Sequence, residues 1–138
     1  MRRKIIIMTL LTTLMLSTQI VSAIELNEDT EQGSTRYKYI ERVSVGLAIK
    51  SGTAKVTTEA KDVDGDTTSM SCTATLQKKS GDSWKKVSSW SKSTQSNVLS
   101  LSKTKAVSKG KYRVKSIVKA YKGSNHETVT KYSGVITY

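Results

Sequence analysis

Apolar residues recur at every second position along most of this chain, and this alternation limits the possible fold more than any other feature. It runs through residues 43–50, 54–61, 70–77 and 111–121, which are separated by short stretches rich in Gly, Ser, Asp and Asn. Side chains alternate between the two faces of a β-strand, so these segments are predicted to be half-buried strands. Beyond residue 23, no helical repeat of three and four persists over several turns, so the fold is expected to be all-β.

Three more segments bring the prediction to about seven strands. They are residues 84–91, 98–101 and 127–138, and residues 103–110 are predicted to be a connection. Asp64-Gly65 is predicted to form a hairpin turn, and the three-residue spacing of Val87 and Trp90 predicts a β-bulge. Seven short strands in about 100 residues are typical of an antiparallel immunoglobulin-like sandwich, with a small barrel as the alternative.

A motif around Tyr112 supports the sandwich. Val107, Gly110, Tyr112 and Val114 form the pattern V-x-x-G-x-Y-x-V. In immunoglobulin-like sandwiches, a tyrosine at the start of the penultimate strand hydrogen-bonds back across a corner of the fold. Tyr112 is therefore predicted to be a structural residue, and Val114 stands where true immunoglobulin domains have their second cysteine.

The two tryptophans, Trp84 and Trp90, are also predicted to be structural. The chain has six Tyr but no Phe, so few large side chains are present to fill a core. We expect one tryptophan in the core and the other partly exposed. The alternative is that both stack on sugar rings as a carbohydrate-binding platform.

The first 23 residues have the order of a secretory signal peptide. A basic MRRK precedes the apolar stretch IIIMTLLTTLML, and small residues follow at 21–23. This order predicts a signal helix cleaved after Ala23 and a secreted, extracellular protein; an uncleaved N-terminal anchor is the alternative. Residues 24–38 are polar, acidic and aperiodic and are predicted to be flexible, whereas residues 39–138 are predicted to form the β-sandwich domain.

Charge is distributed unevenly along the chain. Residues 24–66 contain nine acidic and six basic residues, whereas residues 67–138 contain fourteen basic residues and only Asp82 and Glu127 as acids. Export argues against nucleic acid as a partner. The polyanions met outside a cell are anionic cell-wall polymers, anionic membrane surfaces and acidic glycans, so the charge favours binding to one of these.

The basic residues gather on one face of the predicted strand 111–121. Lys111, Arg113, Lys115 and Lys119 alternate there with a mostly apolar row, so they are predicted to form an anion-binding face. Two alternatives remain: the lysines only keep the sandwich soluble and protect its edges, or the protein is an exported antimicrobial or cytolytic protein that acts on bacterial membranes.

With these strands in place, the chain resembles a family of small exported proteins of Gram-positive, clostridia-like bacteria, a domain of unknown function. The matching residues are Leu76-Gln77, Gly81, Trp84, Val87, Trp90, Gly110, Tyr112-Arg113-Val114, Glu127-Thr128, Thr130 and Tyr132-Ser133. The resemblance covers most of the chain from about Tyr39. It implies export and a β fold, and it assigns no catalytic residue.

The sequence contains one acidic cluster with the composition of a calcium site. Asp62, Asp64 and Asp66 form D-x-D-G-D, but an EF-hand loop needs Gly at its sixth and Glu at its twelfth position, where this chain has Thr67 and Thr73. The preferred interpretation is an acidic turn, so no metal is predicted. The alternative is a calcium site without the geometry of an EF-hand.

The chain lacks the residue sets of common enzymes, so no enzymatic activity, catalytic residue or cofactor is predicted. It has one Cys and one His. Cys72 shares its strand face with apolar residues and is predicted to be buried, whereas His126 lies in a polar turn. A Cys72–His126 nucleophile and an intermolecular Cys72 disulfide are the alternatives, and a monomer is the expected state.

Overall fold

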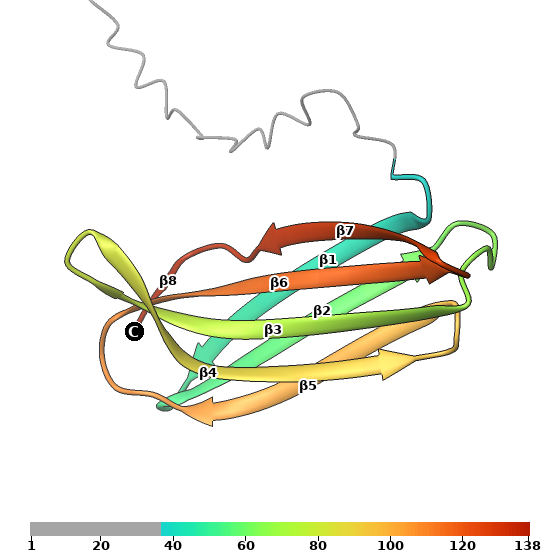
Figure 1. The fold of residues 1–138 in the computed structure, drawn as a ribbon. Helices are drawn as coiled ribbons and strands as arrows, with labels where there is room; N and C mark the ends of the chain where they lie inside the picture. Colours follow the sequence, from blue (N-terminus) through green and yellow to red (C-terminus); the bar gives the residue numbers. More distant parts are fainter. Residues whose placement is uncertain (1–36) are drawn as a thin grey trace, which may run out of the picture. The chain divides into compact units, whose positions relative to one another are not determined.

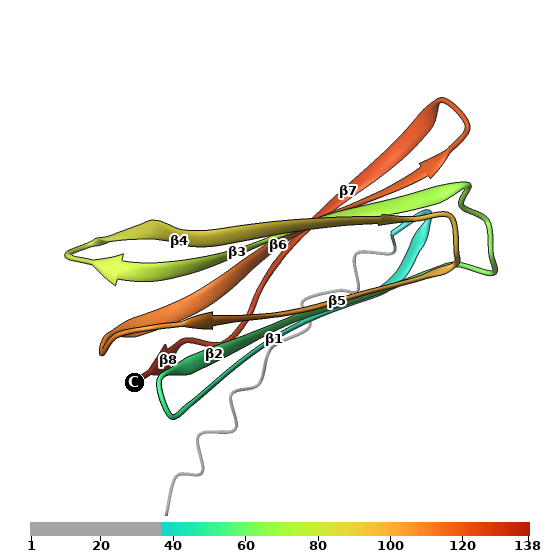
Figure 2. The same ribbon diagram turned by 90° about the horizontal axis from the view of Figure 1, so that it is seen from below.

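Eight antiparallel strands in two layers make up the computed structural model, which describes residues 37–138 (Figure 1 and Figure 2). The strands are β1 (Ile40–Lys50), β2 (Thr53–Asp62), β3 (Ser69–Ser80), β4 (Ser83–Thr94), β5 (Val98–Ala106), β6 (Lys111–Lys122), β7 (Asn125–Tyr132) and β8 (Ile136–Thr137). The smaller sheet has the order β1-β2-β5. The larger has the order β4-β3-β6-β7, and β8 also pairs with β6. The predicted signal peptide and the acidic residues up to 36 lie outside the described residues.

Hairpins join neighbours within a sheet, and longer connections cross between the sheets. The β1–β2 hairpin turns at Ser51 and Gly52, whose φ angles of 50° and 74° suit a two-residue turn of the primed type. The Asp64-Gly65 turn is different, because β2 and β3 belong to different sheets. The prediction of a hairpin at Asp64-Gly65 is therefore wrong: alternation showed the two strands, but it does not show which strands pair.

Two strand boundaries also differ from the sequence prediction. β5 continues to Ala106 through residues predicted to be a connection. It pairs with β2 along its whole length, and as an edge strand it needs no apolar row in its second half. The predicted final strand is divided into β7 and β8, which pair with different parts of β6. The total is therefore eight strands and not seven.

The predicted bulge is present in β4. Leu76 of β3 is opposite Ser88, and the next residue, Gln77, is opposite Lys86. Val87 is thus the extra residue on β4. A bulge shifts the side-chain alternation by one position, so Trp90 and Trp84 lie on opposite faces of the sheet: Trp90 is in register with buried Ala74, and Trp84 with Lys79 on the outer face.

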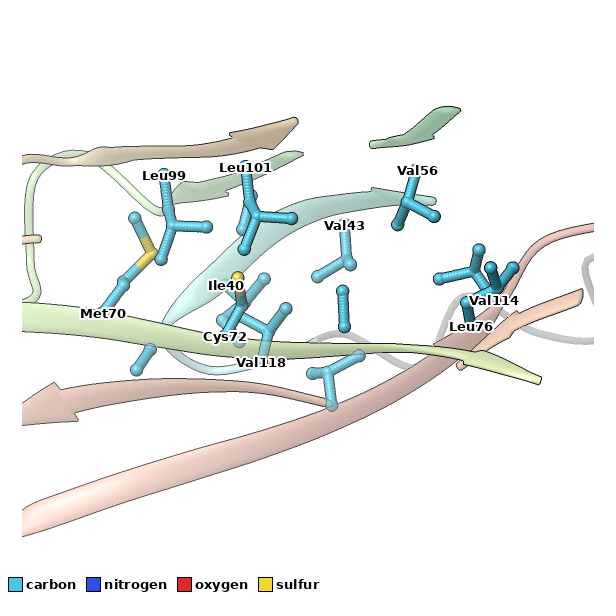
Figure 3. Close-up of a cluster of buried hydrophobic side chains, with 14 of the residues drawn as sticks. Ile40, Val43, Val56, Met70, Cys72, Leu76, Leu99, Leu101, Val114 and Val118 are labelled. Atoms are coloured by element: carbon cyan, nitrogen blue, oxygen red, sulfur yellow. The ribbon is translucent and has the colours of Figure 1, made fainter. Parts of the chain in front are cut away.

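The core lies between the two sheets and is built from small and aliphatic side chains (Figure 3). The larger sheet contributes Met70, Cys72, Leu76, Val114 and Val118, and the smaller sheet Ile40, Val43, Val56, Leu99 and Leu101. Tyr39 and Tyr112 are the buried aromatic residues. Neither tryptophan is fully buried: Trp90 packs partly against the core, and Trp84 takes no part in it.

One hydrogen bond crosses the centre of this core. The hydroxyl groups of Thr58 on β2 and Ser116 on β6 are 2.6 Å apart, and both residues are fully buried. Each hydroxyl satisfies the other, which removes the cost of burying an unpaired polar group. The bond also joins the two sheets directly, from β2 to β6.

Candidate functional site

The two sheets differ strongly in charge. The strands of the larger sheet contain eleven Lys and Arg residues and one acid, Glu127, whereas those of the smaller sheet contain six basic and three acidic residues. Two ion pairs occur within residues 37–138, Lys61 with Glu41 and Lys122 with Asp66. Most cations of the larger sheet therefore have no carboxylate partner in the described domain.

Four of these cations form a row on β6, and we call Lys111, Arg113, Lys115 and Lys119 the basic face. Between them, Tyr112, Val114, Ser116 and Val118 point into the core and are buried. Strand alternation therefore turns the basic face outward. Lys111 and Lys119 are exposed, Arg113 and Lys115 are half-buried, and Ile117 interrupts the row between Lys115 and Lys119.

Arg113 makes the most contacts in this row. Its Nε donates a hydrogen bond of 2.9 Å to Gln77 Oε1 on β3. Its Cζ lies 4.3 Å from the ring centroid of Trp84 and 4.5 Å from that of Tyr132. The strand order puts Trp84 and Tyr132 on opposite sides of β6. The guanidinium is thus braced by two aromatic rings, an arrangement that cation–π attraction favours. Sequence reasoning missed this cluster, because its members lie on four different strands.

Tyr112 begins β6 at a corner of the fold. Its hydroxyl donates a hydrogen bond of 2.8 Å to the backbone oxygen of Ser108, and the side chain is 1% exposed. Lys78 covers the same corner: its Nζ donates to Ser108 Oγ at 2.8 Å and lies 5.6 Å from the Tyr112 ring centroid. This is the contact expected of a tyrosine corner.

Two of the three carboxylates in the acidic cluster at residues 62–66 have partners within the domain. Both oxygens of buried Asp62 accept bonds, from the Gly65 backbone N–H and from the N–H and hydroxyl of Thr67. Asp66 pairs with Lys122. Among residues 37–138, no group of three His, Cys, Asp or Glu side chains is placed to hold a metal ion. Asp62 shapes the connection between the sheets.

Cys72 and His126 lie in different environments. Cys72 is buried, as predicted, and is a free thiol. Burial raises the pKa of the Cys72 thiol, and a hydrogen bond with the Lys92 backbone and the positive charge of Lys92 oppose this only partly. His126 is exposed on β7, where its ring lies 5.9 Å from that of Tyr121. A buried thiol with a raised pKa is a poor nucleophile.

A shallow slot lies at one side of the sandwich, between β4 and β5. It has a volume of about 240 Å³ and is lined by Ser91, Lys92, Ser100, Leu101, Ser102 and Lys103. Lys92 Nζ crosses it to donate a 2.7 Å hydrogen bond to the Ser100 backbone oxygen. Sequence reasoning could not predict this slot, because it depends on two strands from different sheets lying side by side.

Glu127 is a second residue whose role sequence reasoning missed. Its carboxylate accepts hydrogen bonds from the backbone N–H groups of Lys38, Tyr39 and Ile40, at 2.8, 2.8 and 3.1 Å. Glu127 thereby ties β7 to the chain segment that enters β1. Lys38 and half-buried Tyr37, at the end of the segment 24–38 that is predicted to be flexible, thus contact the domain.

Comparisons with known proteins add little to this geometry. No family model matches the chain, and no curated protein matches its sequence. Within the described part of the chain, no helix is long and apolar enough to cross a membrane. The chain is similar in structure to wild-type OgpA from Akkermansia muciniphila, with a TM-score of 0.47 and 14% sequence identity. The match covers 73% of this chain and 30% of the OgpA chain, and a likeness this distant carries no argument about function.

Proposed function

We propose that this protein is a secreted, non-enzymatic domain that binds anionic cell-surface or cell-wall polymers through the outer face of its larger sheet. The observation that carries the proposal is the charge on the strands of that sheet, eleven basic residues against one acid, of which Lys111, Arg113, Lys115 and Lys119 form an outward row on β6. A sandwich that needs lysines only for solubility has its charges of both signs mixed, because a single-sign surface repels itself.

The spacing of the basic face supports binding to a polymer. Outward residues two apart on a strand are separated by roughly 7 Å. This is shorter than the screening length of about 8 Å at physiological salt, so neighbouring cations act together on a chain of anions. Binding of this kind is multivalent and weakens steeply as salt is added, because each neutralised anion releases a counterion.

Two matched triple variants test the proposal. Lys111, Lys115 and Lys119 are replaced by Gln on the larger sheet, and Arg42, Lys50 and Lys55, all exposed, are replaced by Gln on the smaller sheet. Both variants lose three charges. Sedimentation with wall fragments, with and without their anionic polymer, measures binding. We expect the first variant to bind roughly tenfold more weakly or worse and the second to bind nearly as wild type. Equal losses, or binding that salt does not weaken, would contradict the proposal.

A killing assay with purified protein separates wall binding from the antimicrobial alternative. A protein that only binds wall polymer leaves related bacteria viable, whereas a cytolytic protein makes them leak. The predicted secretion is tested by the intact mass of protein from culture medium, which is expected to begin at Ile24.

We also infer that the sandwich is immunoglobulin-like. Three observations support this: β1-β2-β5 pack on β4-β3-β6-β7, β4 extends the sheet of β3 and β6, and the Tyr112 hydroxyl bonds back to Ser108. In antibody domains a disulfide joins the second and the penultimate strand. Here the Thr58–Ser116 hydrogen bond joins β2 and β6, the corresponding strands.

A designed disulfide tests the inferred topology. In a Cys72→Ala background, Thr58→Cys and Ser116→Cys are expected to pair on oxidation, because their hydroxyls are already 2.6 Å apart. Closing a loop of this length stabilises the fold by up to about 4 kcal/mol. Peptide mapping detects the bond. If the two thiols stay reduced in the folded protein, β2 and β6 do not face each other as inferred.

A further inference from the structure

The guanidinium of Arg113 is held on three sides, whereas each lysine of the basic face carries its ammonium group at the end of a flexible side chain. Trp84 and Tyr132 flank its Cζ at 4.3 and 4.5 Å, and Gln77 accepts a bond from its Nε. Holding an arginine in one orientation lowers the entropy that a ligand must overcome on binding. Arg113 is thus the pre-organised cation of the face.

The end of this guanidinium is available to a ligand. Arginine has five N–H donors, and the bond to Gln77 uses only one of them. Within residues 37–138, the two Nη atoms make no hydrogen bond and no carboxylate lies in ion-pair range of Arg113. No side-chain nitrogen of this domain is both buried and unpaired, so the Nη atoms reach solvent. Four N–H groups remain, and one on each Nη points in a parallel direction, the arrangement that binds two oxygens of one anion.

We propose that Arg113 binds a phosphate group of the ligand through Nη1 and Nη2, between the rings of Trp84 and Tyr132. This inference rests on the proposed function and adds to it the chemical group that is recognised. The surrounding lysines then attract the polymer by charge alone, while Arg113 selects the group. A diffuse basic surface has no such selectivity, because it responds to charge density and not to shape.

The number of nearby ammonium groups favours phosphate over carboxylate. Lys111 and Lys115 lie two residues to either side of Arg113 on the same face, and Lys79 Nζ lies 5.8 Å from the centroid of the same Trp84 ring. A carboxylate has two oxygens, and the Arg113 fork occupies both. The four oxygens of a phosphate are arranged tetrahedrally, so while two terminal oxygens contact the fork the group still presents oxygen toward a lysine on another side, which a planar carboxylate does not.

Titration with small anions at constant ionic strength tests this site separately from polymer binding. Inorganic phosphate and acetate are added to the isotope-labelled protein, and the NMR signals of the Arg113 side chain and the Trp84 indole are followed. Trp90, on the other face of the sheet, is the internal control. We expect saturable shifts of Arg113 and Trp84 with phosphate, and acetate to bind at least about fivefold more weakly. Equal responses to both anions, or shifts spread evenly over all lysines, would overturn the proposal.

Two variants keep the charge and change only the geometry. Arg113→Lys removes the fork, and Gln77→Leu leaves the arginine but removes the acceptor of its Nε. Loss of a bidentate contact is expected to weaken phosphate binding about tenfold, and the loss of orientation in Gln77→Leu somewhat less. Lys55→Gln is the matched control: it removes one exposed charge on the smaller sheet, away from the basic face, and is expected to change phosphate affinity less than twofold. If Arg113→Lys lowers the melting temperature but binds phosphate as wild type does, the cluster serves only to hold β4 and β7, and the proposal is wrong.

Polymer and vesicle experiments identify the source of the phosphate and keep the two proposals distinguishable. A phosphate-rich wall polymer and vesicles with an anionic phospholipid are compared, using wild type and Arg113→Lys. We expect the polymer to bind more tightly and to lose affinity in the variant. Tighter binding to vesicles would make the membrane the ligand. If Arg113→Lys leaves polymer binding unaffected, the Arg113 site is wrong and the proposed function stands. If phosphate binds at Arg113 but the protein does not bind polymer, the proposed function is wrong and the Arg113 site stands.

Discussion

The sandwich has two lateral edges, and the chain closes them differently. At one edge β7 lies beside β1, and at the other β4 lies beside β5 (Figure 1). At the first edge, Glu127 accepts three backbone N–H groups from residues 38–40. At the second, the crossing bond is that of Lys92 to the Ser100 oxygen, over an open slot.

The difference follows from what each edge offers. Residues 38–40 bring three N–H groups that need an acceptor, and one carboxylate satisfies all of them with charge-assisted bonds. β4 and β5 instead turn lysines toward the gap between the sheets: Lys92 is in register with Cys72, Lys103 with Val56 and Lys105 with Ala54. Inward-pointing charges on edge strands prevent pairing with other chains. We therefore expect the β1–β7 edge to contribute more to stability, and the lysines of the β4–β5 edge to limit association with other chains.

Among variants that probe the two edges, the replacement of Glu127 by Ala is expected to change stability most. It leaves three backbone N–H groups without their acceptor, so the free energy of unfolding should fall by about 2–4 kcal/mol. Chemical denaturation measures this. Glu59→Ala, an exposed acid on the outer face of β2, is the control and should change little. If both variants unfold at the same denaturant concentration, the β1–β7 edge is not closed by Glu127.

Tyr112→Phe is expected to have the second largest effect. It tests whether the Tyr112 hydroxyl holds β5 in place at the β4–β5 edge. Tyr112 bonds to Ser108 in the connection that leaves β5. Without the hydroxyl, the Ser108 oxygen loses its partner and the protein should lose about 1–3 kcal/mol of stability. Tyr37→Phe is the control, because the Tyr37 hydroxyl makes no hydrogen bond within the described domain. An unchanged unfolding midpoint in Tyr112→Phe would show that the corner does not support β5.

Replacing both Lys92 and Lys103 by Met is expected to change stability by less than about 1 kcal/mol. The effect should instead appear as association, because two charges that protect the β4–β5 edge are lost. Light scattering over a range of concentrations measures it, with Lys50→Met and Lys55→Met on the outer face of the smaller sheet as the control pair. If the double variant stays as monomeric as the control, Lys92 and Lys103 do not protect the β4–β5 edge against association.

The smallest expected effect concerns Cys72, which is in register with Lys92 beside the open edge. Burial raises the pKa of its thiol. The unfolded chain therefore loses this proton first, so stability should decline as the pH rises above about 8.5, the usual thiol value, toward the folded pKa. Wild type should show a steeper decline over this range than Cys72→Ala. Identical slopes would mean that the open edge already gives the thiol access to water.

The fold class could be read from the sequence, and the pairing of strands could not. Alternation identified the buried row of β6 and the burial of Cys72, because a strand has a period of two wherever it lies. Alternation did not predict the part of β5 beyond Leu101, because no apolar row exists there. It also could not show that Asp64-Gly65 connects strands of two different sheets.

The candidate site divides in the same way. The outward direction of Lys111, Arg113, Lys115 and Lys119 follows from the buried residues between them, so the sequence alone predicts it. The aromatic brace of Arg113 does not follow. Trp84 reaches the outer face only because the bulge at Val87 reverses the alternation of β4, and Tyr132 reaches Arg113 only because β7 pairs with β6.

By itself, then, the sequence determined an all-β chain, its strand faces and its concentration of positive charge, since these are local properties of the chain. Only the tertiary structure decided which strands meet, and with that the contacts of Glu127, the Thr58–Ser116 bond, the slot at β4–β5 and the setting of Arg113. Each of these joins residues between 8 and 89 positions apart. Contacts at such separations depend on sheet order and register, which alternation along a single strand does not encode.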